Sequence, residues 1–228
     1  MTDHGQKARR ETFERIYKQG GWPGSKESVS GRGSEVAATE MLRADLEGWI
    51  AQRLDVYTFL DAPCGDYNWM RLVKFRENIR YIGGDIVKDL IDVLNERYKT
   101  ETKTFMQLDV VTDELPACDA WFCRDLLIHL PLEDGVRVVR KFRNSPIKYF
   151  LSTTFPAMNN DREIDYGKVR AVNVEIPPFN LGRPMMMLRD PDPAQFNAEP
   201  SRVRKFIGVW ANTQDGHRPA LTDKDVGE

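Results

Sequence analysis

Short β-rich runs alternate along the chain with segments of helical periodicity. The predicted strands are Val56 to Leu60, Tyr81 to Gly83, Thr104 to Leu108, Ala120 to Cys123 and Ile147 to Thr154. Between them, apolar residues three or four positions apart predict helices at about 67 to 76, 88 to 98 and 132 to 143. Strands separated by helices of this length indicate parallel strands joined by crossover helices, and therefore an α/β fold.

The segment before the first strand is predicted to be helical. Residues 8 to 19 place Phe13, Ile16 and Tyr17 on one helix face, and Ser34 is a suitable N-cap for a helix that runs to about Arg53. Glycine and serine dominate the stretch between these two helices. Residues 1 to 54 are therefore expected to form an N-terminal helical cap.

The chain is less regular after the fifth strand. Residues 156 to 183 are rich in Asn, Asp, Pro and Gly and predict a long loop. Such a loop in a compact domain is usually a functional lid or disordered. Two final strands are expected at Met185 to Leu188 and Phe206 to Trp210, so that the core spans 55 to 212. The polar residues 213 to 228 predict a loose tail.

Acidic residues stand at the ends of three consecutive predicted strands. Asp61 precedes a turn that contains Gly65, and Asp85 and Asp109 end the next two strands. In open parallel sheets ligands bind at the carboxyl ends of the strands, where an acid about 20 positions after a glycine turn can accept both ribose hydroxyls. Each acid has an alternative role as a helix cap or turn residue. Because the three acids occupy equivalent positions at the ends of consecutive strands, a binding site is favoured over these alternatives.

The string Asp61-Ala62-Pro63-Cys64-Gly65-Asp66-Tyr67 resembles the strand end and glycine loop of class I S-adenosylmethionine-dependent methyltransferases. The longer strings LDAPCGDYNWM and CRDLLIHL are similar to those of a largely uncharacterised bacterial subgroup. The resemblance covers roughly 56 to 155. It implies a Rossmann-like sheet of seven strands, the last one antiparallel, with helices on both faces. Because only the central glycine of the usual loop is present, an NAD-binding enzyme is disfavoured.

The resemblance also implies a cofactor, S-adenosyl-L-methionine, and the residues that hold it. Gly65 would lie against its amino-acid portion with Asp61 supporting the loop, Asp85 would bind the ribose, and Asp109 the adenine. The segment Ser30 to Ser34 would fold over the cofactor or simply connect two helices. The full set of expected cofactor residues is Gly31, Ser34, Asp61, Ala62, Pro63, Gly65, Trp69, Asp85, Ile86, Asp109, Val110 and Arg124.

The segment after the fourth strand, which faces the reactive methyl group in this fold, carries Arg124, Asp125 and His129. Methyl transfer to a hydroxyl needs alignment and removal of a proton. His129 is the candidate base because imidazole titrates near neutral pH. Asp125 could orient the imidazole, bind the acceptor or act as a base itself. The alternatives are a core histidine and a structural Arg124 ion pair. A weaker alternative is Mg²⁺ held by Asp125, His129 and Asp161; no metal is expected.

The long loop is expected to contact the acceptor. Its mixture of amides, carboxylates and aromatic residues suits a polyhydroxylated ligand, although solvated loops share this composition. The expected acceptor residues are Asn160, Asp165, Tyr166, Arg170, Asn173 and Phe179.

Composition narrows the functional class further. Lys plus Arg number 33 and Asp plus Glu 35, so that a long nucleic acid is a disfavoured partner. Cys64, Cys118 and Cys123 lack CxxC spacing, which disfavours a zinc site and suits a reducing compartment. The polar N-terminus is not a signal peptide, and no apolar run is long enough to span a membrane. We therefore expect a cytoplasmic monomer or homodimer.

These observations together predict a methyltransferase that O-methylates a saccharide or another small polar hydroxyl compound. An N-methyltransferase of an amine or a protein side chain is the first alternative. A cofactor-binding protein without catalysis is the second.

Overall fold

The computed structural model describes residues 2–191 and 204–212, with side chains from Gly5 onward. Seven strands form one sheet in the order β3-β2-β1-β4-β5-β7-β6. Strands β1 to β5 are parallel, whereas β7 runs antiparallel to both of its neighbours, β5 and β6. The expected α/β class, the seven strands and the antiparallel last strand are confirmed.

Most of the predicted elements are present with small changes at their ends. The strands are β1 (Thr58–Asp61), β2 (Arg80–Asp85), β3 (Lys103–Gln107), β4 (Ala120–Cys123), β5 (Tyr149–Thr154), β6 (Met186–Arg189) and β7 (Phe206–Ala211). The α-helices are α1 (Thr2–Lys18), α2 (Glu40–Gln52), α3 (Lys88–Tyr98) and α4 (Leu132–Arg143).

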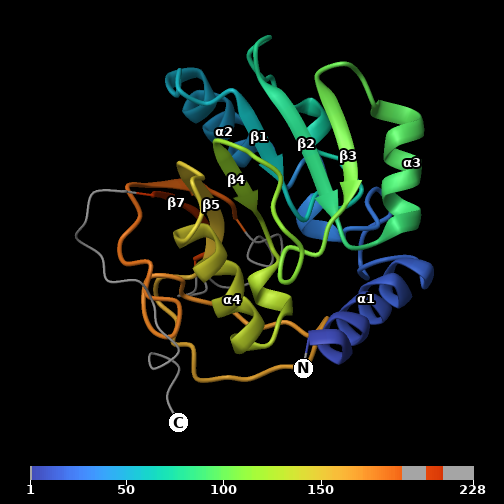
Figure 1. Cartoon of the computed structure of the whole chain (residues 1–228), viewed down its shortest axis with the longest axis vertical. Coiled ribbons are helices and arrows are strands. Elements are labelled where there is room, and N and C mark those ends of the chain that lie inside the picture. The colour runs from blue at the N-terminus through green and yellow to red at the C-terminus, as the bar shows by residue number, and fades with distance from the viewer. Residues whose placement is uncertain (1, 192–203, 213–228) are drawn as a thin grey trace.

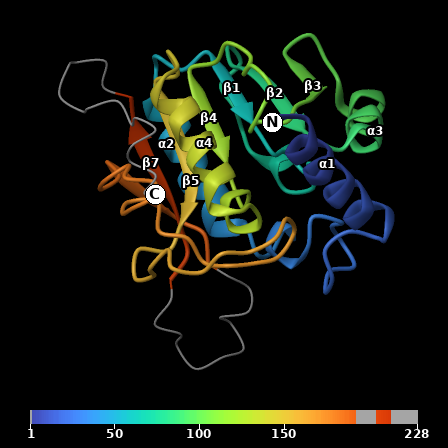
Figure 2. The same cartoon turned by 60° about the horizontal axis from the view of Figure 1, so that its bottom comes forward.

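Helices cover both faces of the sheet, and α1 lies beside the carboxyl ends of β2 and β3 (Figure 1). Figure 2 shows α4 in front of the sheet and α2 behind it. The strands alternate between two cores: Leu60 and Trp121 pack on the side of α4, and Phe59 and Phe122 pack with α2 and α3. This alternation follows from the two-residue period of a strand.

Two local predictions are wrong. No α-helix spans 67 to 76; only a 3₁₀ turn at Met70–Leu72 occurs there. Tyr67 takes a φ of 58° and is buried, as is Trp69, so that tertiary packing of these aromatic rings replaces a helix. Ser34 is not a helix N-cap either, because it ends the 3₁₀ turn Arg32–Ser34 and α2 begins at Glu40.

The segment 156 to 183 contains no helix or strand, as predicted, and its backbone is held by specific hydrogen bonds. Phe155 donates its N–H to the carbonyl of Val172, and Arg170 donates to that of Ile128. The loop therefore lies directly against the ends of β4 and β5. The predicted tail, 213 to 228, lies outside the described residues.

Candidate functional site

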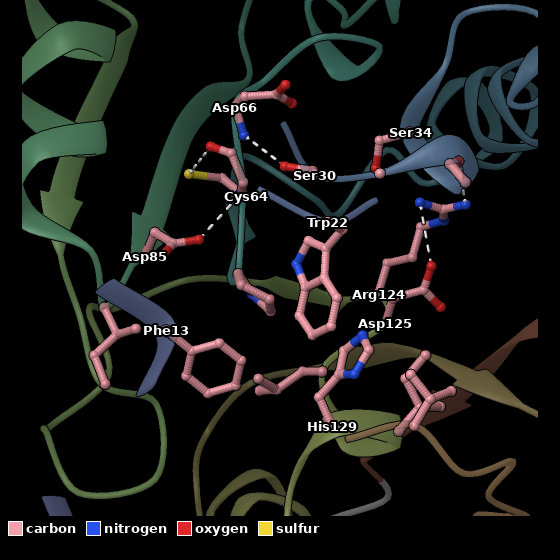
Figure 3. Close-up of a pocket in the computed structure, with 18 of the residues that line it drawn as sticks. Phe13, Trp22, Ser30, Ser34, Cys64, Asp66, Asp85, Arg124, Asp125 and His129 are labelled. Carbon is pink, nitrogen blue, oxygen red and sulfur yellow. Dashed lines mark hydrogen bonds and ion pairs between the residues drawn. The ribbon is translucent and has the colours of Figure 1, made fainter. Parts of the chain in front are cut away.

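A pocket of about 620 Å³ opens at the carboxyl ends of the strands. Its wall combines the strand ends with α1, with residues 20–34 (hereafter the cap segment) and with the long loop. Figure 3 shows Phe13 of α1, Trp22 of the cap segment and His129 after β4 facing a shared space. A volume of this size falls within the range of small-molecule sites.

The turn after β1 is joined to the end of β2 by Asp85. The Asp85 carboxylate accepts the N–H of Gly65 at 3.1 Å and that of Val87 at 3.1 Å. Gly65 has a φ of +53°, and an added Cβ would lie 2.4 Å from the Ser30 hydroxyl oxygen. Only glycine therefore fits at this turn. The predicted helix at 67 to 76 is absent, and so no α-helix begins directly after this turn.

Burial raises the pKa of Asp85 to about 6, although the N–H groups of Val87 and Gly65 oppose the shift. The side chain is only 4% exposed and lines the pocket. It is thus mostly ionised at pH 7, and each carboxylate oxygen has a further lone pair besides its backbone hydrogen bond.

Asp61 also lines the pocket, but its hydrogen bond is with the neighbouring strand. The Tyr81 hydroxyl donates to the Asp61 carboxylate at 2.6 Å. Burial raises the pKa of Asp61 to about 8, and the Tyr81 hydrogen bond and the Arg124 charge only partly oppose this. The Asp61 carboxyl is therefore a largely protonated group that holds β1 to β2.

Asp109 lies in the pocket wall, but an arginine from α1 binds its carboxylate. Arg9 donates from Nε to Asp109 Oδ1 at 2.9 Å and from Nη2 to Oδ2 at 2.6 Å. Arg9 also pairs with Asp134 at the start of α4. This pairing anchors α1 beside the pocket and occupies the Asp109 oxygens that were expected to bind an adenine. The sequence contained no signal for it.

The cap segment is fastened to the Gly65 turn. Ser28 donates its hydroxyl to Asp66 at 2.8 Å, and Asp66 donates its N–H to the Ser30 hydroxyl at 3.0 Å. The Tyr17 hydroxyl lies 3.1 Å from that of Ser30. These bonds bring Gly31 and Ser34 into the pocket wall.

Arg124 and Asp125 belong to a buried network of four charges. Arg124 donates from Nε and Nη2 to Asp190 at 2.9 Å and from Nη2 to the Gly33 carbonyl at 2.8 Å. Lys205 binds Asp125 at 2.7 Å and Asp190 at 3.1 Å. Arg124 therefore forms a structural ion pair, which was the alternative to a catalytic role. Lys205 also lines the pocket, and nothing in the sequence indicated it.

This network makes Asp125 a poor proton acceptor. Although burial acts to raise its pKa, the charges of Lys205 and Arg124 hold it well below the usual range. Asp125 makes no hydrogen bond to His129 in the described part of the chain. The expectation that Asp125 orients the imidazole is thus wrong; the Lys168 carbonyl does so instead.

His129 is held in one tautomer on the pocket wall. Its Nδ1 lies 2.9 Å from the Lys168 carbonyl oxygen. Because a carbonyl can only accept, Nδ1 carries the hydrogen and Nε2 keeps a free lone pair. The ring stacks on Trp22 with centroids 4.1 Å apart (Figure 3). Burial lowers its pKa despite the opposing Lys168 bond, so that the imidazole is neutral at pH 7.

Most polar residues of the long loop hold the loop itself together. Asn160 donates to the carbonyls of Asn173 and Pro177, each at 2.8 Å, and Asn173 donates to that of Pro156 at 3.0 Å. Tyr166 donates to Asp134, and Phe179 is fully buried. Of the six expected acceptor residues, only Arg170 lines the pocket; Asn160, Asp165, Tyr166, Asn173 and Phe179 do not.

The expected cofactor residues gather at the pocket almost completely. Ala62 is the exception: it is fully buried, and its carbonyl accepts the indole N–H of Trp121 at 3.0 Å. The others in the pocket wall are Gly31, Ser34, Asp61, Pro63, Gly65, Trp69, Asp85, Ile86, Asp109, Val110 and Arg124.

The described residues contain no cluster of three metal-ligating side chains, and Asp161 is exposed outside the pocket wall. The weak Mg²⁺ alternative therefore lacks a third ligand. No helix in the described ranges is long and apolar enough to cross a membrane.

No protein-family model and no curated protein matches the sequence. Solved structures do match. A Burkholderia thailandensis 1,6-didemethyltoxoflavin-N1-methyltransferase with S-adenosylhomocysteine is 16% identical, with a TM-score of 0.62 over 92% of this chain and 89% of that one. The Synechocystis PCC 6803 magnesium protoporphyrin IX methyltransferase with bound SAM is 13% identical, with a TM-score of 0.58 over 90% and 97%.

A third similar structure is the [4+2]-cyclase SpnF, which is 14% identical with a TM-score of 0.52 over 81% of this chain and 74% of that one. At these identities the likeness concerns the fold. The strand order and the antiparallel β7 agree with it. The chain has the fold of the class I S-adenosylmethionine-dependent methyltransferases.

Proposed function

We propose that this protein binds S-adenosylmethionine in the strand-end pocket and transfers its methyl group to a hydroxyl of a small acceptor. The observation that carries the proposal is that one pocket joins the Gly65–Asp85 turn, suited to a nucleoside, with a neutral His129. Similar structures with bound SAM or S-adenosylhomocysteine support the choice of cofactor.

The residues present fit this cofactor. The Gly65 turn has no room for a side chain, and Asp85 has a largely ionised carboxylate in the pocket wall. Asp85 would accept hydrogen bonds from ribose hydroxyls, and Ile86 and Val110 would pack against the adenine. When bound, S-adenosylmethionine supplies a methyl group already activated by its positively charged sulfur.

His129 would supply the remaining chemistry. Its Nε2 lone pair would accept the proton that an acceptor hydroxyl loses on methylation, and the Lys168 carbonyl would stabilise the resulting imidazolium through Nδ1. The fixed ring position, set by this bond and by the Trp22 stack, limits the geometries that the acceptor can take.

The composition of the long loop favoured a saccharide acceptor, but of the side chains behind that argument only Arg170 lines the pocket. We therefore propose a small hydroxyl-bearing acceptor without specifying a sugar. An amine acceptor is the second candidate, and it would need little help from His129. The third candidate is a protein that transfers no methyl group, because a [4+2]-cyclase has a similar fold.

Calorimetric titration with S-adenosylmethionine and S-adenosylhomocysteine, with and without Mg²⁺, tests the cofactor. We expect micromolar binding that does not depend on Mg²⁺. Incubation with S-adenosylmethionine and a panel of hydroxyl and amine compounds then tests transfer, by mass spectrometry of the products. Absence of binding by both ligands would overturn the proposal; transfer only to amines would select the second candidate.

A further inference from the structure

The Arg170 guanidinium is a buried cation without a hydrogen-bond partner among the described residues. Arg170 lines the pocket with 3% of its surface exposed, and its Nε, Nη1 and Nη2 are almost inaccessible to solvent and lack a hydrogen-bond partner in the described part of the chain. Buried charges in proteins are normally paired, because desolvation is costly. The two other buried arginines of the wall follow this rule: Arg9 pairs with Asp109 and Asp134, and Arg124 with Asp190.

Glu163, the acid whose charge acts on Arg170, accepts hydrogen bonds from other residues. Burial lowers the pKa of Arg170, and the charge of Glu163 opposes the shift. The exposed Glu163 carboxylate accepts the N–H of Leu132 at 3.0 Å and that of Ile164 at 3.2 Å. It therefore supports the start of α4 and makes no hydrogen bond to Arg170. A guanidinium remains charged in proteins, so that Arg170 carries a positive charge that no acid of the described residues binds.

The backbone of Arg170 is fixed beside the proposed base. Gly167 donates its N–H to the His129 carbonyl at 3.0 Å, and Arg170 donates to that of Ile128 at 3.0 Å. Together with the His129–Lys168 bond, these contacts join residues 167–170 to the turn that carries the imidazole. The same pocket is lined by apolar side chains of Phe13, Ile128, Phe155, Val169 and Ala171.

We propose that the methyl acceptor carries a carboxylate on an apolar body, and that the Arg170 guanidinium turns into the cavity to bind this carboxylate. The inference rests on the proposed function, because it concerns the acceptor side of the same site. A planar guanidinium matches a carboxylate with two parallel hydrogen bonds. The other buried cations of the wall, Arg9, Arg124 and Lys205, are already paired, so that a single negative charge is matched better than a phosphate dianion.

Binding of benzoate and benzamide to the protein saturated with S-adenosylhomocysteine tests the proposal. The two probes share their shape, and only benzoate carries a charge. We expect wild type to prefer benzoate, Arg170→Gln to lose about tenfold or more of benzoate affinity, and Arg170→Lys to keep part of it. Arg162→Gln is the control: it removes an exposed arginine of the same loop and should change nothing.

Three outcomes would overturn the inference: equal wild-type affinity for both probes, undiminished benzoate binding by Arg170→Gln, or an equal loss in Arg162→Gln. Failure of S-adenosylhomocysteine to bind wild type would contradict the proposed function instead, and so the two failures are distinguishable. Preference for phenyl phosphate over benzoate would replace the carboxylate by a phosphate and overturn the charge argument.

Thermal unfolding of Arg170→Met separates ligand binding from a structural role. Replacing an unpaired buried cation by an apolar chain should leave the melting temperature unchanged or raise it. Benzoate should stabilise wild type and not the variant. A lower melting temperature together with an equal loss of S-adenosylhomocysteine affinity would show that Arg170 is structural and would overturn the inference.

Discussion

The two halves of the pocket use their polar residues differently. On the side of β1 and β2, the buried Asp85 lines the cavity and still has acceptor capacity for a ligand. On the side of β4 and β5, the amides of Asn160 and Asn173 bind backbone carbonyls of their own loop. Among the described residues, the acceptor half has apolar side chains, the paired Asp125 and Lys205, and the His129 and Arg170 side chains, which form no ion pair.

This difference shows that a polar loop is not by itself a polar site. A loop without helix or strand must satisfy its backbone groups by other means, and Asn side chains do this well. Residues that serve this purpose are unavailable to a ligand. The groups that distinguish acceptors are then few, and each should have a large effect when changed.

The largest effect is expected from His129→Asn, which retains an N–H near the Lys168 carbonyl but has no base. Turnover on a hydroxyl acceptor should fall about 10²- to 10⁴-fold, with the affinity for S-adenosylmethionine unchanged. Steady-state kinetics and calorimetry on the same preparations check this. Turnover within a factor of about three of wild type would remove His129 as the base and favour an amine acceptor.

Asp85→Ala should weaken S-adenosylhomocysteine binding about 100-fold, because it removes the charged acceptor for the ribose and frees the N–H of Gly65. Calorimetry measures the dissociation constant. Asp89→Ala, an exposed acid in the first turn of α3, is the matched control and should bind normally. An unchanged dissociation constant for Asp85→Ala would refute the ribose assignment.

Cofactor binding should also weaken in acid. The pKa of Asp85 is raised to about 6, so that lower pH protonates the carboxylate and removes an acceptor site. S-adenosylhomocysteine affinity should be constant above pH 7 and fall up to about tenfold per pH unit below pH 6. Asp85→Asn should flatten this profile. A wild-type profile that is flat down to pH 5 would contradict the assignment.

The smallest effect on function is expected from Asn173→Ala. The variant leaves the Pro156 carbonyl and the Glu175 N–H without their present partners, which should lower the free energy of unfolding by about 1–3 kcal/mol. Cofactor affinity should not change. Denaturant unfolding checks this, with the exposed Asn159→Ala as control. A higher KM for an acceptor at unchanged stability would mean that Asn173 contacts the acceptor.

The cofactor half could be predicted because its signals are local. Buried strands are recognised from apolar runs, and parallel strands bring their carboxyl ends to one edge of the sheet. Asp61, Gly65, Asp85 and Asp109 therefore meet at one pocket from their positions alone. The position of His129 after the fourth strand follows from the same rule.

Long-range pairing could not be predicted in this way. Arg9 and Asp109 are 100 positions apart, and their ion pair depends on where α1 docks. The failed helix at 67 to 76 has the same cause: Tyr67 and Trp69 pack into a core formed by distant strands, and this burial outweighs local helical periodicity.

The sequence by itself determined the α/β class, the strand ends at which the site lies and the identity of its acids, because strand periodicity is a property of neighbouring residues. Tertiary structure alone decided which of the polar groups remain free. Within the described ranges, Asp109 and Arg124 are paired, Asp85 has acceptor capacity in the wall, and the buried Arg170 guanidinium has no hydrogen-bond partner. Pairing depends on which groups the folded chain brings within hydrogen-bonding distance.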